Sequence, residues 1–230
     1  MMGFILIAAA VLSLLSGGQS APVTNCDDLT QIIEIQGREQ LLGKWTSLAE
    51  STNVSGSGLL STLHVGSSWV KHTAANESNT IDVFEAINIF GRCYTSRSTK
   101  TLKNNTLSVE QPMAASEVLL KTGCPDCLVI SSKYTSGQSL QFLSRRNKVT
   151  AAEMEEFTKQ VKCLNLPSPV IFDSDKGFCP EESTKNTTDV NTATDEDYFK
   201  LAGDILGSED VVKGVLESIF SSLADLIEDD

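Results

Sequence analysis

The cysteines are the residues whose type and spacing could do the most chemistry in this chain. Cys124 and Cys127 stand in the run Gly-Cys-Pro-Asp-Cys. This spacing suits a redox dithiol, half of a zinc site or a short disulfide. The chain has six cysteines and only two histidines, His64 and His72. A histidine-rich metal centre or a histidine-dependent catalytic triad is therefore disfavoured, and the sequence predicts no resident metal or cofactor.

The compartment decides how the cysteines are interpreted. Phe4 to Leu15 form an apolar run followed by small residues up to Ala21, a pattern typical of a signal peptide cleaved near Ser20 or Ala21. We therefore expect a secreted, extracellular protein whose cysteines pair in an oxidising compartment. Six cysteines allow 15 pairings, and spacing alone does not choose among them.

Other features agree with a secreted protein. No later stretch contains the roughly 18 apolar residues that a membrane span requires, so we expect no transmembrane anchor. Four Asn-x-Ser/Thr sequons lie in predicted loops, where glycans attach. They begin at Asn53, Asn76, Asn104 and Asn186.

The charge is acidic and unevenly distributed. The net charge is −12; residues 1–182 hold 18 acids and 15 bases, whereas residues 183–230 hold 12 acids and 3 bases. An acidic chain is a poor partner for a polyanion, so nucleic-acid binding is disfavoured.

Eight short β-rich runs follow one another at spacings of about ten residues, separated by polar turns. Without helical periods between them, this pattern indicates a sandwich or an up-and-down barrel. The predicted strands are Gly43–Ser51, Leu63–Thr73, Thr80–Ile89, Arg92–Thr101, Thr106–Gln111, Ser116–Lys121, Leu128–Tyr134 and Ser139–Arg145.

A helix is predicted after the last of these strands. Thr150 and Glu153 form a capping box, and Met154, Phe157 and Val161 begin an apolar stripe at three- and four-residue steps. One helix after eight strands favours an all-β fold, a closed barrel with the helix packed outside. We expect a signal peptide (1–20), a barrel domain (21–182), a polar linker (183–195) and an acidic amphipathic helical tail (196–230).

The tail has two interpretations. Its apolar stripe could dock on the barrel or support self-association, or it could bind a lipoprotein or another partner. The polar face has too few Lys and Arg residues to favour anionic membranes.

Several residues resemble those of a known family. Gly43-Lys44-Trp45 matches the Gly-x-Trp motif of lipocalins, and the run ending at Arg145 resembles the motif whose arginine packs over that tryptophan. The region from Glu153 to Pro167, with Cys93 and Cys179, is similar to orosomucoid. Residues 22–182 resemble the orosomucoid-like proteins that bind saxitoxin and tetrodotoxin, or tributyltin.

The resemblance implies an eight-stranded antiparallel up-and-down lipocalin barrel in which Gly43, Trp45 and Arg145 are structural. It also implies the pairings Cys26–Cys163 and Cys93–Cys179. Cys124 and Cys127 are then left over, which favours a local disulfide in a turn.

The layout suggests carriage of a small molecule rather than catalysis, because no strand presents a nucleophile beside a base. An eight-stranded barrel has room for one small ligand, and the resemblance implies a toxin or xenobiotic. Aromatic rings with Glu85 or Asp82 would hold a guanidinium, and an imidazole would suit an organotin. The predicted ligand-binding residues are Trp69, His72, Phe84, Tyr94, Tyr134 and Phe142.

Two other functions remain open. A lipocalin with a reactive thiol could be an enzyme, which requires a free cysteine. An immunomodulatory or lipoprotein-associated protein could act through the tail helix.

Overall fold

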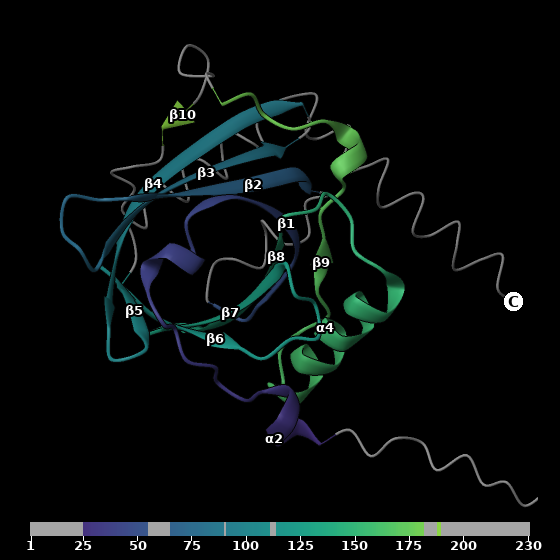
Figure 1. Cartoon of the computed structure of the whole chain (residues 1–230). Helices are drawn as coiled ribbons and strands as arrows, with labels where there is room; N and C mark the ends of the chain where they lie inside the picture. Colours follow the sequence, from purple (N-terminus) through teal and green to yellow (C-terminus); the bar gives the residue numbers. More distant parts are fainter. Residues whose placement is uncertain (1–24, 55–64, 90, 111–113, 182–187, 190–230) are drawn as a thin grey trace, which may run out of the picture.

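The computed structural model describes residues 25–54, 65–89, 91–110, 114–181 and 188–189 (Figure 1). The predicted signal peptide (1–20), the tail (196–230), most of the linker (183–195), and the positions His64 and Asn186 lie outside the described residues.

Eight consecutive antiparallel strands form a closed barrel (Figure 1). Each strand pairs with the next, and β8 pairs with β1, which closes the ring. This confirms the predicted barrel and, within one or two residues, most of its strand boundaries. The strands are β1 (Gly43–Thr52), β2 (Val65–Ala74), β3 (Thr80–Ile89), β4 (Arg92–Lys103), β5 (Thr106–Val109), β6 (Ala115–Leu120), β7 (Cys127–Tyr134) and β8 (Gly137–Ser144).

Two short strands extend the sheet. β9 (Val170–Ile171) pairs antiparallel with Ala49 and Glu50 of β1. β10 (Thr188–Asp189) pairs parallel with β4 and lies in the range expected to be linker.

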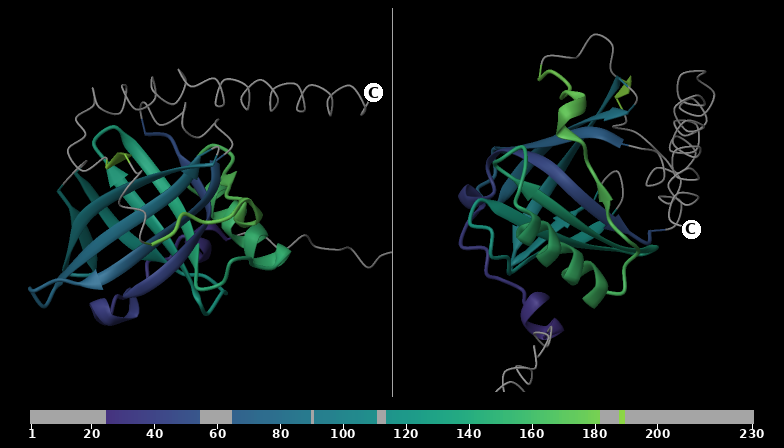
Figure 2. Two further views of the ribbon diagram at one scale, coloured as in Figure 1. Left: turned by 90° about the horizontal axis from the view of Figure 1, so that it is seen from above. Right: turned by 90° about the vertical axis from the view of Figure 1, so that its right-hand side faces the viewer.

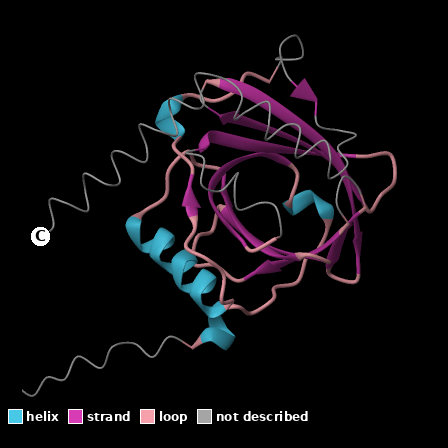
Figure 3. Cartoon of the chain, turned by 180° about the vertical axis from the view of Figure 1, so that it is seen from behind, coloured by secondary structure: helices cyan, strands magenta, loops and turns pink. Residues whose placement is uncertain are grey.

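The helix α4 (Ala151–Cys163) lies against the outside of the barrel (Figure 3). Its N-terminus has the predicted capping box, in which Thr150 accepts from the Glu153 backbone and Glu153 accepts from the Thr150 backbone. Phe157 and Val161, each 1% exposed, belong to the same apolar cluster as Phe142 and Leu140 of β8. The helix therefore covers the outer face of this side of the sheet.

The arm before β1 and the one-turn 3-10 helix η1 (Arg38–Gln40) meet the closed end of the barrel. Asn105, in the tight turn after β4, accepts from the Ile35 backbone N–H at 2.5 Å and donates to the Ile33 carbonyl at 3.1 Å. Asn104 and Asn105 both have positive φ, which a two-residue hairpin of type I′ requires. The turn thus holds the arm across the end.

The residues expected to be structural meet at this end. The Arg145 guanidinium lies 3.4 Å from the centroid of the Trp45 ring and donates to the carbonyls of Lys44 (2.8 Å) and Leu42 (2.5 Å). Gly43 has a φ of +98°, and a Cβ there would lie 2.8 Å from Arg145 Nη1. The positive φ therefore favours glycine, and a larger residue would also displace the Arg145 guanidinium from the Trp45 ring.

All six cysteines are paired in disulfides. Cys26–Cys163 and Cys93–Cys179 are the pairs that the resemblance implied, and Cys124–Cys127 is the local disulfide expected of the two left over. The first joins the short helix α2 (Cys26–Leu29) to α4, and the second joins β4 to the segment after α4. Among the described residues, none of the helices has the length and apolar character needed to span a membrane.

The two further views separate the barrel from its coverings (Figure 2). α4 follows one side of the barrel wall, and the chain after it, which contains η2 (Ser174–Lys176), runs over the outer face of the sheet near β2. The interior of the ring is left for side chains and a cavity.

Candidate functional site: a polar cavity inside the barrel

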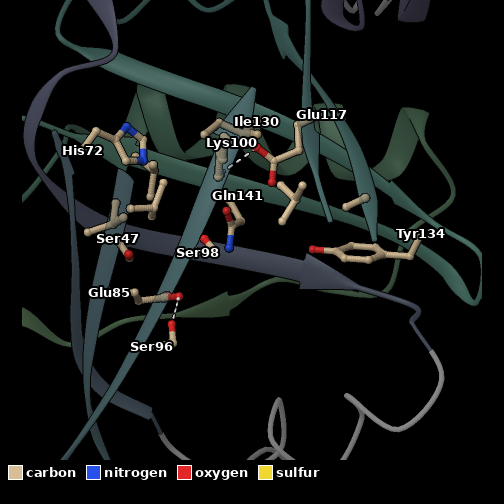
Figure 4. A pocket seen from close by; sticks show the side chains of 15 residues that line it. Ser47, His72, Glu85, Ser96, Ser98, Lys100, Glu117, Ile130, Tyr134 and Gln141 are labelled. Carbon is tan, nitrogen blue, oxygen red and sulfur yellow. Dashed lines mark hydrogen bonds and ion pairs between the residues drawn. The ribbon is translucent and has the colours of Figure 1, made fainter. Parts of the chain in front are cut away.

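The barrel interior has an apolar part and a polar part. Inward-facing side chains such as Trp45, Ile81, Leu107 and Leu119 form an apolar core cluster with Leu41, which precedes β1. Beside this cluster lies a cavity of about 170 Å³. Its lining consists of Ser47, Val70, His72, Val83, Glu85, Ser96, Ser98, Lys100, Val109, Ala115, Glu117, Ile130, Tyr134, Gln141 and Leu143 (Figure 4).

Strand alternation explains this lining. Side chains two residues apart on a strand share a face. On β4, Ser96, Ser98 and Lys100 therefore enter the cavity together, as Val83 and Glu85 do on β3. Most of these are polar, so the cavity differs from the mostly apolar pocket that carriers of hydrophobic ligands have.

A β-bulge adds another carboxyl to this interior. The register between β1 and β8 shifts between Ser47 and Ala49, so Ser47 opposes Leu143 whereas Glu50 opposes Gln141. Leu143 and Gln141 both line the cavity, and their partners Ser47 and Glu50 are three residues apart instead of two. The bulge thus reverses the alternation of β1 and directs Glu50 inward.

An ion pair lies in the cavity wall. Lys100 Nζ is 2.6 Å from Glu117 Oε2, and the two side chains are 10% and 6% exposed. Ser132 donates to the other oxygen of Glu117 at 3.3 Å. Lys100 and Glu117 neutralise each other, so Glu50 and Glu85 are the acids that no second base balances among the described residues of the interior.

Glu50 and Glu85 are half-buried, and this partial removal from water disfavours their charged form. It raises the pKa of Glu50 to about 7, and repulsion from Glu85 acts in the same direction, while a hydrogen bond from Gln141 opposes it. The pKa of Glu85 is also raised, mainly by burial, although Lys100 and a hydrogen bond from Ser96 lower it. Figure 4 shows the contact between Glu85 and Ser96, at 3.5 Å.

His72 and Tyr134 are the predicted ligand-binding residues that the structure places in the cavity lining (Figure 4). Burial and the Lys100 charge lower the pKa of His72 to about 4, so the imidazole is neutral at pH 7. Its Nδ1 lies 2.9 Å from the Leu41 carbonyl, which requires the proton on Nδ1. Burial raises the pKa of Tyr134 to about 12, and this phenol stays protonated. That either residue binds a ligand stays a prediction.

The prediction that Trp69 and Phe84 face the interior was wrong. Their strand neighbours Val70 and Glu85 line the cavity, so the two rings point outward. They lie 5.4 Å apart, and Trp69 Nε1 donates to the Cys179 carbonyl at 2.8 Å. The segment fixed by the Cys93–Cys179 disulfide covers Trp69, which explains an exposure of only 1% for an outward ring.

Phe142 also points outward, so its predicted position in the interior was wrong. Its neighbours Gln141 and Leu143 line the cavity, whereas Phe142 stacks on Phe157 of α4 with the ring centroids 5.1 Å apart. Tyr94 has the inward parity of Ser96 on β4 but is not among the lining residues. Three of the six predicted residues thus belong to the outer layer.

Sequence reasoning missed Glu50, Lys100 and Glu117. Lys100 could have been found from strand alternation, because it lies four residues after Ser96, the residue that pairs with Glu85. Glu50 could not have been found, because no residue type in β1 indicates the bulge. Of the two acids proposed for a cation, Glu85 lines the cavity. Asp82 is exposed on the outer face and accepts from Thr99 at 3.2 Å.

The remaining predicted positions lie elsewhere on the molecule. Asn53, Asn76 and Asn104 are exposed beside or within turns, where a glycan has room, and their glycosylation stays a prediction. Cys124, Asp126 and Cys127 lie close together, but the two sulfurs are joined in a disulfide. The sulfurs are therefore not free for zinc or for thiolate chemistry in this state.

Taken together, the closed eight-stranded antiparallel barrel, the one helix packed outside it and the arginine over the Gly-x-Trp tryptophan define the lipocalin fold. A solved structure of the siderocalin Ex-FABP, described as functioning through dual ligand specificities, has this fold. It is similar to the chain with a TM-score of 0.51 and 16% identity, over 59% of this chain and 95% of that one.

A structure of the odorant binding protein OBP1 is also similar, with a TM-score of 0.48 and 13% identity over 59% of this chain and 90% of that one. No protein-family model matches the chain, and no curated protein sequence matches it either.

Proposed function

We propose that the protein is a secreted carrier or scavenger that binds one small molecule inside the barrel. The observation that carries this proposal is the cavity itself, which has hydrogen-bonding groups from seven of the eight barrel strands and carboxyls in excess of bases. The disulfide pairing of all six cysteines supports an extracellular location, and it argues against the reactive-thiol enzyme, which would need a free cysteine.

The lining favours a cationic ligand with several N–H donors. Glu85 in the lining and Glu50, which faces the interior beside Gln141, supply acceptors, and Gln141, Ser96 and Ser98 add neutral partners. Among the toxins that the sequence resemblance implied, the guanidinium compounds saxitoxin and tetrodotoxin fit this chemistry better than tributyltin. An organotin would need a soft ligand, and among the described residues that line the cavity this is the imidazole of His72.

Calorimetric titration of the secreted, glycosylated protein with saxitoxin, tetrodotoxin, tributyltin and a neutral steroid tests the proposal. We expect saturable one-to-one binding of a guanidinium toxin. Glu85→Gln should weaken it by about 10- to 100-fold, because a charge-assisted hydrogen bond contributes about 1.5–3 kcal/mol. Asp82→Asn is the matched control, since Asp82 lies on the outer face of the same strand. Binding of the steroid alone would contradict the cationic ligand.

The alternative function, as a lipoprotein-associated or immunomodulatory protein acting through the tail, concerns residues outside the described part of the chain. If none of the four compounds binds, deletion of residues 183–230 followed by particle-binding measurements becomes the informative experiment.

A further inference from the structure

We infer that Glu50 and Glu85 form a proton-exchange site: the empty cavity holds one proton on this pair, and an organic cation that enters the cavity takes its place. This inference rests on the proposed function, because it names how that same cavity is regulated. It makes pH a determinant of when the carrier loads and unloads.

The two acids face the interior of the barrel from different strands. Glu50 reaches the interior only because of the bulge in β1, and Glu85 reaches it from β3, two strands away. The two carboxyls interact, because a negative charge on Glu85 disfavours the ionisation of Glu50. Two carboxylates that share a poorly solvated space repel each other, and one proton relieves the repulsion.

Four other charged or titratable groups face this pair. Among the described residues these are His72 on β2, Lys100 on β4, Glu117 on β6 and Tyr134 on β7. Other lining residues carry no charge. They include Val109 on β5, Ile130 on β7, and Gln141 and Leu143 on β8.

These neighbours leave the pair without a positive partner of its own. The imidazole is neutral at pH 7 and the phenol is protonated. Lys100 lowers the pKa of Glu85, but its ammonium makes its 2.6 Å contact with Glu117. Three carboxyls thus face one ammonium, which leaves two negative charges in excess when all three are ionised, and a proton or a ligand cation reduces this excess to one.

A protonated pair makes the binding of a cation depend on pH. The pKa of Glu50, about 7, means that the empty site is largely protonated at mildly acidic pH. A monocation must displace that proton, so its affinity should fall by up to about tenfold for each pH unit below 7 and level off above it. A neutral ligand of the same shape displaces no proton and should show no such dependence.

The experiment uses the full secreted protein with benzamidinium and its neutral near-isostere benzamide as probes. Carbon-13 NMR of the glutamate carboxyls, assigned with Glu50→Gln and Glu85→Gln, should give a Glu50 midpoint near pH 7 that moves lower in Glu85→Gln. Benzamidinium should bind about tenfold or more weakly at pH 5.5 than at pH 8. Calorimetry in two buffers of different ionisation enthalpy should show close to one proton released at pH 6.

Benzamide binding should be independent of pH, Glu50→Gln should reduce the pH dependence for benzamidinium, and Asp82→Asn should leave it unchanged. If both acids titrate below pH 5, the inference is wrong whatever binds. If the cation binds without proton release, the exchange is wrong while the proposed carrier function stands. If the pair titrates near pH 7 but neither benzamidinium nor the guanidinium toxins bind, the cationic ligand of the proposed function is contradicted and the exchange fails with it.

Discussion

Single side chains set the character of the cavity. A barrel interior of this size is often filled with aliphatic residues, but here alternate positions on β4 carry Ser96, Ser98 and Lys100. Each buried polar group needs a partner, and Lys100 finds Glu117 while Glu85 finds Ser96. The polar interior therefore combines partnered groups with a surplus of acid, which is the property that a cationic ligand would use.

His72 provides a prediction at this scale. It is 3% exposed, and its pKa of about 4 lies below the ordinary value of 6.5. Between pH 6.5 and 4 the unfolded chain binds a proton at this position that the folded protein does not. The contribution of His72 to stability is therefore complete above pH 6.5 and is lost as the pH falls to 4, by at most about 3 kcal/mol.

Urea unfolding of the protein and of His72→Gln at several pH values measures this effect. The difference in unfolding free energy between the two proteins should be constant above pH 7.5 and should shift against the native protein as the pH falls from 6.5 to 4. Taking the difference removes the carboxyls that titrate in both proteins. A difference that does not vary with pH would show that His72 is protonated normally in the folded state.

At the scale of elements, the barrel needs cover on its outer surface as well as contents inside. Phe142 and Phe157 stack between β8 and α4, and both are almost completely buried. We expect Phe157→Ala to destabilise the protein by about 3–4 kcal/mol, through lost transfer energy and the cavity left behind. Denaturant unfolding checks this value.

Phe84→Ala is the comparison, because Phe84 is an outward ring that is only partly buried, between Trp69 and Arg97. Its loss should cost about 1–2 kcal/mol. Equal costs for the two variants would contradict the role of α4 as the main cover.

The elements could be predicted from the sequence far better than the directions of their side chains. The turns and the capping box at Thr150 are local signals, so strand and helix boundaries followed from them. Which face of a strand is inward depends on long-range cover. Trp69 and Phe142 looked like ligand contacts because an aromatic residue suits either a pocket or a cover, and only the positions of Cys179 and α4 distinguish the two.

The inward direction of Glu50 could not be predicted from the sequence either. By simple alternation from Trp45 and Ser47, the inward positions on β1 would continue through Ala49 and Ser51. The register shift makes Ala49 1% exposed in the outer cluster and turns Glu50 inward. A one-residue change of register reverses a strand, and the sequence around Leu48 has no glycine or proline that signals it.

At the scale of the whole molecule, the disulfides attach the outer segments to the barrel. Cys93–Cys179 closes a loop with a sequence separation of 86 residues, whereas Cys124–Cys127 spans 3. In the chain-entropy description the longer link contributes about 4–5 kcal/mol and the shorter one about 2 kcal/mol. The longer link also holds the segment whose carbonyl accepts from Trp69.

These two disulfides should therefore differ in both stability and spectrum when they are removed. Cys93→Ser/Cys179→Ser should lower the unfolding free energy by several kcal/mol, and it should also shift the tryptophan emission to longer wavelength. The chain has two tryptophans. Trp45 points into the barrel beneath Arg145, whereas Trp69 on the neighbouring strand points outward against Cys179, so the shift reports Trp69. Cys124→Ser/Cys127→Ser should leave the emission unchanged. An unshifted emission in the first variant would mean that packing alone, without the disulfide, keeps the segment after α4 on the outer face of the sheet.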